Sequence, residues 1–303
     1  MNKEVYLPKG IIPVVPTPFK SDEKNEINWD VYGELIDYVI ENGVHAIVIG
    51  GTTGEYSTMT YDERRQLMEF GIKRINGRVH AIAGSYAHGS MKYTRELTAY
   101  ANKLGYEGVL VTSPYYCPPD EKGMYQFYKT LADENPELGI LVYNVPACTN
   151  VPLSVELMAK LAKIPNIVST KDTTDLIHSS KLINATKDER FTVLTGEEHL
   201  ILGDLAIGGG GGIGIISAMC PKPMVNIYNL MEANDVKAAA EINAKMMTLY
   251  SLTEDEPNPA PVKAALNILG FDFGDPRLPV LPASDEMYAK LRKELKAVGY
   301  DVK

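Results

Sequence analysis

Short apolar runs alternate along this chain with longer segments whose apolar residues recur at helical spacing. Each run is apolar at nearly every position, which is typical of parallel strands covered on both faces. The eight runs span residues 11–16, 45–50, 79–84, 108–113, 139–144, 166–171, 191–196 and 212–217. Eight strands that alternate with helices predict a closed (β/α)8 barrel. The alternative, an open doubly wound sheet, would usually carry a glycine-rich dinucleotide fingerprint after its first strand, where Val14–Pro18 is proline-rich instead.

Polar residues mark where several of the helical segments begin. Asn28, Ser90 and Ser154 each stand where a side-chain oxygen can accept from the first free backbone N–H groups of a helix. Thr60 followed by Glu63 has the spacing of a capping box. After the eighth run, three more helical segments follow at about residues 235–253, 257–270 and 284–298. The pattern therefore predicts a barrel over residues 1–225 and a C-terminal helical region over residues 226–303.

Charge and composition exclude several classes of function. The chain has 303 residues and a net charge of -9, which argues against general binding to nucleic acid or to anionic membranes. No apolar run approaches the roughly 18 residues of a membrane span, and the first ten residues lack the apolar stretch of a signal peptide. Three cysteines without a CxxC pair, and five scattered histidines, show no metal-ligand spacing and suit a reducing compartment. We therefore expect a cytoplasmic protein without a metal ion.

Two groups of polar residues follow predicted strands, and the active site of a (β/α)8 barrel lies at the C-terminal ends of its strands. The second run leads into Gly50-Gly51-Thr52-Thr53-Gly54-Glu55, where hydroxyls and free N–H groups could bind a carboxylate. The same residues could form a plain glycine-rich turn. The fifth run ends near Tyr143, which could transfer protons beside a cationic group or could simply fill the mouth of the barrel.

A lysine ends the sixth run. Lys171 ends a run that contains the apolar residues Ile167 and Val168. A lysine amine that is partly desolvated there has a lowered pKa and can form an imine with a ketone. The commoner alternative is a lysine at a strand end that reaches solvent. The five glycines of residues 208–212 lack the phosphate-loop pattern and indicate close backbone approach beside the eighth strand.

Taken together, these motifs resemble the N-acetylneuraminate lyase/dihydrodipicolinate synthase family of pyruvate-dependent class I aldolases. The resemblance rests on GGTTGE (50–55), SPYY (113–116), YNVP (143–146) and STKDTT (169–174), in this order, and it covers essentially the whole chain. It implies that Lys171 forms an imine with pyruvate or a 2-keto acid and that Tyr143 is the general acid and base.

The resemblance also implies roles for residues around the imine. Thr52 and Thr53 would bind the carboxylate of the 2-keto acid, and Thr53 would relay protons. Tyr116 would complete this relay from a neighbouring subunit, which implies at least a dimer and typically a homotetramer formed by two dimers. Gly196 and Ile213 would offer backbone groups near the imine. Neither a metal nor an organic cofactor is expected, because the lysine itself supplies the electron sink.

Departures from the family pattern bear on the substrate. Cys148 stands where dihydrodipicolinate synthases have an arginine for the carboxylate of the second substrate, and a thiol cannot form that bidentate pair. Ile215 stands where sialic-acid lyases have a serine. The segment 171–178 resembles the KDT-x-x-x-x-H pattern of 2-keto-3-deoxy sugar acid (gluconate-type) aldolases, as do residues 191–200 and 275–282. We therefore expect reversible cleavage of a 2-keto-3-deoxy sugar acid to pyruvate and an aldehyde.

Thr173 and Glu198 are candidate contacts to the sugar hydroxyls, although Glu198 could equally stabilise the N-terminus of a helix. The alternatives within the family are a dihydrodipicolinate synthase and a keto-deoxy sugar acid dehydratase. A keto-acid-binding sensor is the alternative outside catalysis, and the presence of both Lys171 and Tyr143 argues against it. A phosphosugar isomerase would rest only on fold analogy and the glycine run.

Overall fold

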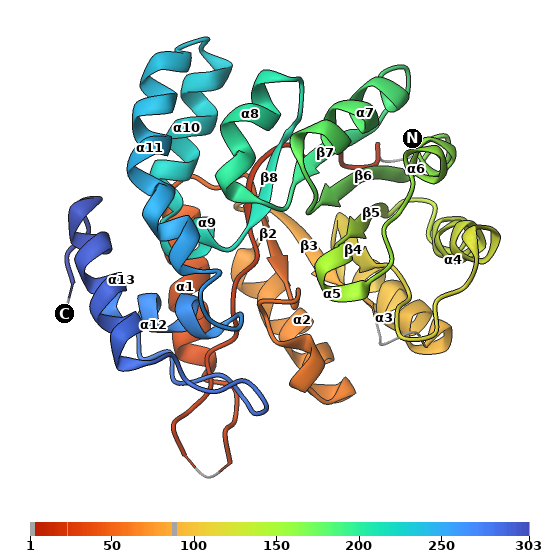
Figure 1. Ribbon diagram of the computed structural model, residues 1–303. Helices are drawn as coiled ribbons and strands as arrows, with labels where there is room; N and C mark the ends of the chain where they lie inside the picture. Colours follow the sequence, from red (N-terminus) through yellow and green to blue (C-terminus); the bar gives the residue numbers. More distant parts are fainter. Residues whose placement is uncertain (1–3, 23, 87–89, 303) are drawn as a thin grey trace.

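The computed structural model describes residues 4–22, 24–86 and 90–302, which form a (β/α)8 barrel with additional C-terminal helices (Figure 1). The parallel strands are β1 (Gly10–Pro13), β2 (Ala46–Ile49), β3 (His80–Gly84), β4 (Gly108–Thr112), β5 (Gly139–Asn144), β6 (Ile167–Asp172), β7 (Thr192–Thr195) and β8 (Gly211–Gly214). They are hydrogen-bonded in the order β1-β8-β7-β6-β5-β4-β3-β2. A parallel bridge between Val14 and Val48 joins β1 to β2 and brings the two edges of the sheet together. The predicted barrel is confirmed.

Helices surround the strands. The longer ones are α1 (Trp29–Glu41), α2 (Tyr61–Ile75), α3 (Met91–Leu104), α4 (Glu121–Glu134), α6 (Val155–Leu161), α7 (Leu176–Thr186), α8 (Ile201–Ala206) and α10 (Pro221–Glu232). Short helical turns are η1 (Tyr56–Thr58), α5 (Pro146–Thr149), η2 (Glu198–Leu200) and α9 (Ile216–Met219). No helix within the described residues has the length and apolar character needed to cross a membrane.

Three further helices form what we call the C-terminal extension. They are α11 (Val236–Leu252), α12 (Ala260–Leu269) and α13 (Asp285–Ala297), which lie together on one side of the barrel (Figure 1). Their bounds agree closely with the three predicted segments. The predicted division after residue 225 lies inside α10, so the extension starts only after that helix.

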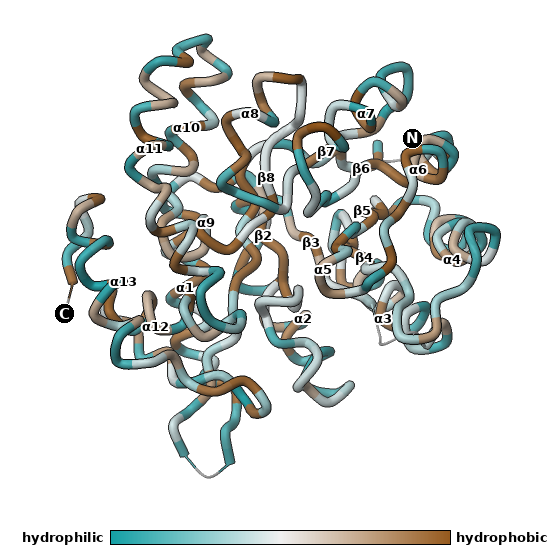
Figure 2. Tube along the Cα trace, viewed as in Figure 1, coloured by the Kyte–Doolittle hydropathy of each residue, from teal (hydrophilic) through white to brown (hydrophobic). Residues whose placement is uncertain are grey.

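Apolar side chains form two layers, one inside the barrel and one between strands and helices. The inner layer includes Ile12, Val48, Ile82, Leu110, Leu141, Val168, Leu194 and Ile213. The outer layer includes Ile11, Ile47, Ile49, Val109, Ile140 and Ile167 together with the inward faces of the helices. In Figure 2 the strands are mostly coloured as hydrophobic and the outer helical turns as hydrophilic. Because both faces of each strand are covered, the runs are apolar at successive positions.

Three of the four predicted helix starts have the expected contacts. Thr60 and Glu63 form the full capping box of α2. Ser90 and Ser154 each accept a backbone N–H at the start of α3 and α6. Asn28 occupies the N-cap position of α1, but its side chain makes no capping hydrogen bond, so that predicted contact is wrong.

Strand β8 is shorter than its predicted run of residues 212–217. It ends at Gly214, and helix α9 follows, with the backbone N–H groups of Ile216 and Ser217 donating to a glutamate carboxylate. Gly211 has φ +131°, and a Cβ atom there would lie 2.1 Å from the carbonyl oxygen of Gly10. The glycine run thus permits close approach of β8 to β1, the structural role that the sequence favoured.

Candidate active site

A cavity of about 720 Å³ opens at the C-terminal ends of the strands, where barrels of this kind carry their active sites. Its walls come from the segments after β2, β5, β6, β7 and β8 and from the loop between α11 and α12. The lining residues include Thr52, Thr53, Tyr143, Cys148, Lys171, Thr173, Gly196, Glu197, Glu198, Ile215 and Asn258. A cavity of about 840 Å³ at the opposite end of the barrel contains none of these residues. We therefore place the candidate site in the first cavity.

Strand pairing brings the lysine and the tyrosine together. Tyr143 on β5 is the register partner of Lys171 on β6, and side chains at matching positions of neighbouring strands share a face. The ammonium nitrogen of Lys171 lies 4.5 Å from the centroid of the Tyr143 ring. The next pair along, Asn144 and Asp172, projects to the other face, toward the helices.

Burial controls the charge on Lys171. Its side chain is only 5% exposed, and this desolvation lowers the pKa of the amine to about 8. The carboxylates of Glu198 and Glu197 raise that pKa again in part, because they favour the cation. A substantial neutral fraction near neutral pH follows, which is what nucleophilic attack on a carbonyl requires.

The segment Gly50–Glu55, which we call the threonine turn, supplies hydroxyls beside Tyr143. Burial raises the pKa of the Tyr143 hydroxyl, and a hydrogen bond with the Thr52 side chain offsets part of this rise. Thr53 is 3% exposed, and its Oγ1 accepts a hydrogen bond of 3.2 Å from Nδ2 of Asn258. A cation at Lys171 would favour the phenolate of Tyr143, so an iminium there would increase the fraction of the tyrosine that is deprotonated and able to accept a proton.

A glycine leaves space for the lysine side chain. A Cβ atom at Gly196 would lie 2.2 Å from Cγ2 of Thr173 and 2.8 Å from Cε of Lys171. The backbone N–H of Gly196 donates to the carbonyl oxygen of Asp172 at 2.7 Å. The Thr173 hydroxyl lines the cavity and donates to the carbonyl oxygen of Asn144 at 2.9 Å. Lys171 and Thr173 can thus extend into the cavity only because residue 196 has no side chain.

A buried carboxylate supports the outer face of these strand ends. Asp172 accepts from Asn144 Nδ2 at 2.6 Å and from the Thr174 hydroxyl at 2.5 Å. His178 Nδ1 lies 3.0 Å from the second carboxylate oxygen, and this contact raises the pKa of the imidazole. The histidine of the KDT-x-x-x-x-H pattern therefore contacts Asp172 behind the site and does not line the cavity.

Three further predicted site residues are Glu198, Ile213 and Tyr116, the last of which is expected to act in the site of a neighbouring subunit. Both carboxylate oxygens of Glu198 accept backbone N–H groups, from Ile216 at 2.5 Å and from Ser217 at 3.0 Å, which is the helix-terminal role. Ile213 is buried in β8 and is not among the residues that line the cavity. Tyr116 is 94% exposed, has φ +68° and also lies outside the cavity.

Several polar residues at the mouth of the cavity were not predicted from the sequence. Glu197, His199 and Glu254 have ligand atoms within 4.8 Å of one another, and among the described residues they are the group that could hold a metal ion. His199 Nδ1 lies 3.7 Å and 3.9 Å from the two carboxylates, and the Glu254 side chain is 63% exposed. Exposed carboxylates commonly gather without a metal, so we assign none here. Only the adjacent acidic pair 197–198 could have drawn attention to this region in the sequence.

Known proteins resemble this chain over nearly its whole length. The model of the "Dihydrodipicolinate synthetase family" matches residues 7–298. A 4-hydroxy-tetrahydrodipicolinate synthase of Syntrophus aciditrophicus is 37% identical over 291 residues, which cover 96% of this chain and 98% of the relative. The crystal structure of dihydrodipicolinate synthase from Aquifex aeolicus superposes with a TM-score of 0.92 at 35% identity, covering 97% and 99% of the two chains. YagE, an Escherichia coli prophage protein solved in complex with pyruvate, superposes at 0.91 with 27% identity, covering 97% and 99%.

Proposed function

Because the chain belongs to the dihydrodipicolinate synthetase family of pyruvate-dependent lyases and synthases, we propose that Lys171 forms an imine with pyruvate. The observation that carries this proposal is the buried amine with a lowered pKa, packed 4.5 Å from the ring of Tyr143 beside Thr52 and Thr53. Water leaves as the imine forms. Loss of a proton from the pyruvate methyl group then gives an enamine whose carbon attacks an aldehyde; cleavage runs these steps in reverse.

Each of these side chains has a role in the reaction steps. Tyr143 accepts and returns the protons, because a neighbouring iminium favours its phenolate. The threonine turn binds the pyruvate carboxylate through hydroxyl and N–H groups. Hydrolysis of the imine ends the cycle and frees Lys171. The electrons of the C–C bond move into the iminium and back, so the amine and two hydroxylic side chains are sufficient for the chemistry.

The relatives favour the synthase as the first candidate for the overall reaction. The relatives that we compared at 34–37% identity are named 4-hydroxy-tetrahydrodipicolinate synthase, and they match over nearly their whole length. This reaction joins pyruvate to aspartate semialdehyde. It was the alternative in the sequence analysis, where the motifs favoured sugar-acid cleavage.

The charge of the cavity keeps sugar-acid cleavage as the second candidate. Among the described residues that line it, Lys171 is the single lysine, and arginine does not occur. Cys148 stands where the synthases of the family have an arginine for the semialdehyde carboxylate, and Glu197 and Glu254 add negative charge to the same cavity. A polyhydroxylated aldehyde needs no such partner and could hydrogen-bond to these carboxylates.

Borohydride trapping tests the imine. The protein is incubated with pyruvate and borohydride, and the modified residue is identified by peptide mass spectrometry; Lys171→Ala is run beside the exposed-lysine control Lys160→Ala. We expect a pyruvate adduct on Lys171 in the wild type and in the control. An adduct on another lysine, or no adduct, would refute the mechanism.

A substrate panel then separates the candidates. Pyruvate with aspartate semialdehyde reports on synthase activity, and pyruvate release from 2-keto-3-deoxygluconate reports on cleavage. A ketone formed without C–C cleavage would indicate a dehydratase. Trapping of pyruvate without turnover of any substrate would favour a keto-acid-binding sensor.

A further inference from the structure

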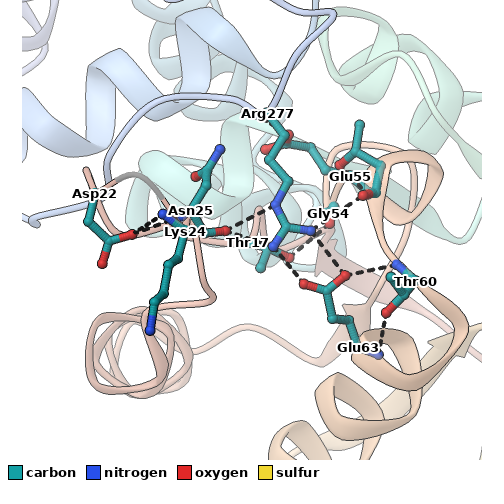
Figure 3. Close-up of polar contacts among 10 residues, drawn as sticks. Thr17, Asp22, Lys24, Asn25, Gly54, Glu55, Thr60, Glu63 and Arg277 are labelled. Atoms are coloured by element: carbon teal, nitrogen blue, oxygen red, sulfur yellow. Dashed lines mark hydrogen bonds and ion pairs between the residues drawn. The ribbon is translucent and has the colours of Figure 1, made fainter.

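The threonine turn contacts the C-terminal extension at its last residue. Glu55 is 3% exposed and has φ +59°, a conformation that is uncommon for a residue with a side chain. Its carboxylate forms an ion pair of 2.5 Å with Nζ of Lys263 on α12 and accepts the backbone N–H of Arg277 at 2.9 Å. Figure 3 shows Glu55 beside Arg277.

Lys263 is held in one place by its surroundings. It is 1% exposed, and Nζ also donates to the carbonyl oxygen of Asp275 at 3.1 Å. The same nitrogen lies 4.2 Å from the centroid of the Phe19 ring. A buried charge with this set of partners has few alternative positions, because any other arrangement leaves it desolvated and unpaired. The pair between Lys263 and Glu55 therefore fixes the end of the turn against the extension.

Arg277 ties the same region to the start of α2. Its guanidinium makes two contacts with the Glu63 carboxylate, the shorter at 2.6 Å, and donates to the carbonyl oxygen of Asn25 at 2.7 Å (Figure 3). Glu63 also accepts from the backbone N–H of Thr60 in the capping box. Arg277 is thus bound to Asn25, which precedes the threonine turn in the chain, and to Glu63, which follows it.

The second contact with the extension is made by the hydroxyl of Thr53, a residue that lines the cavity. Asn258 Nδ2 donates to Thr53 Oγ1 at 3.2 Å. A threonine hydroxyl has one proton and two lone pairs. With one lone pair facing the Asn258 amide, the hydroxyl proton must point elsewhere, and both residues line the cavity. The hydrogen bond therefore sets the direction in which Thr53 can pass a proton.

We propose that Asn258 and Lys263 are positioning residues of the active site. Asn258 orients the Thr53 hydroxyl directly, and Lys263 holds the turn through Glu55. The extension is in this way part of the proton-transfer machinery although it lies outside the barrel. This inference rests on the proposed imine at Lys171, and the experiment must separate the two.

Exchange of the pyruvate methyl protons with deuterated water isolates the step at issue. Enamine formation removes a methyl proton and its reversal returns a deuteron, so the exchange needs pyruvate and no second substrate. It is followed by proton NMR, while borohydride trapping measures the imine on the same samples. The variants are Asn258→Ala, Asn258→Asp and Lys263→Met, with Glu55→Gln/Lys263→Met as a double variant. Matched controls on the surface are Asn229→Ala and Lys290→Met.

We expect Asn258→Ala to trap pyruvate as the wild type does and to exchange about 10- to 100-fold more slowly, part of the roughly 10²–10⁴ that positioned proton transfer contributes. Asn258→Asp should be slower still, because an ionised carboxylate accepts the Thr53 proton and turns it away from the substrate. Lys263→Met should lower both the melting temperature and the exchange rate. The double variant removes the unpaired charge, so it should regain melting temperature without regaining exchange.

Three results overturn different claims. A wild-type protein that traps no pyruvate removes the proposed function itself. If the wild type traps and exchanges, but Asn258→Ala exchanges at the rate of Asn229→Ala, the positioning role of Asn258 is wrong. Recovery of full exchange in the double variant would show that Lys263 serves folding alone. If Lys263→Met does not fold, the double variant decides its role.

Discussion

The pH dependence of imine formation depends on the buried environment of Lys171. Glu197 lines the same cavity, and its negative charge raises the pKa of the amine. Glu197→Gln removes that charge and keeps the shape of the side chain. Because a cation without this neighbour is less favoured, the pKa of Lys171 should fall further. The rising limb of the pH profile should then move to lower pH.

The size of the effect follows from the shift. With a pKa of about 8, about one tenth of the amine is neutral at pH 7, whereas at the ordinary value of 10.5 the neutral fraction is about three in ten thousand. Burial therefore increases the reactive form about 300-fold at this pH. Below the pKa, the trapping rate should rise about tenfold per pH unit and then level off near pH 8 in the wild type.

The assay is the initial rate of pyruvate trapping by borohydride, measured by intact-protein mass spectrometry across a series of buffers. Glu121→Gln changes an exposed carboxylate outside the cavity and serves as the control. A wild-type profile that still rises near pH 10 would show that Lys171 is not desolvated in solution. A shift of the Glu197→Gln profile to higher pH would refute the electrostatic argument.

Three more predictions follow from contacts around the site. Asp172 raises the pKa of His178 in the folded protein. The contact therefore stabilises the fold fully below the unfolded pKa of about 6.5, and this stabilisation is lost as pH rises through the folded pKa. The urea midpoint of the wild type should exceed that of His178→Gln more at about pH 5.5 than at about pH 8.5. Cys148→Arg should lower KM for aspartate semialdehyde about tenfold in steady-state kinetics, since a charge-assisted pair contributes roughly 1.5–3 kcal/mol; an unchanged KM would place the carboxylate elsewhere. Tyr116→Phe should slow exchange of the pyruvate methyl protons without changing the molar mass of the protein measured by light scattering. Equal exchange rates in the variant and the wild type would exclude the Tyr116 hydroxyl from the relay.

The barrel was predictable because its strands are buried on both faces and therefore uniformly apolar. The convergence of Lys171, Tyr143 and the threonine turn was predictable for a related reason: a closed parallel barrel brings all its strand ends to one rim. The end of β8 was not predictable, because residues 215–217, two isoleucines and a serine, fit a strand as well as they fit the helical turn that Glu198 stabilises.

Contacts from the C-terminal extension were invisible in the sequence for a different reason. Asn258 and Lys263 lie in a segment whose own pattern predicts only a helix, and nothing local indicates which loop that helix will meet. The ion pair with Glu55 spans a large separation along the chain and depends on how α12 packs against the barrel. Glu197 and Glu198 both follow β7 and line the cavity, and only the fold shows that the Glu198 carboxylate also accepts backbone N–H groups of α9.

The arrangement of the cavity also bears on how such a protein can change over evolutionary time. Lys171 and Tyr143 are on strands whose inward positions are committed to packing, whereas Cys148 is on the exposed four-residue helix α5. Under the proposed mechanism, point mutations in that helix alter which aldehyde is accepted and leave the imine at Lys171 intact. Lineages that diverge from one ancestor can therefore keep a common first half-reaction while they exchange the second substrate.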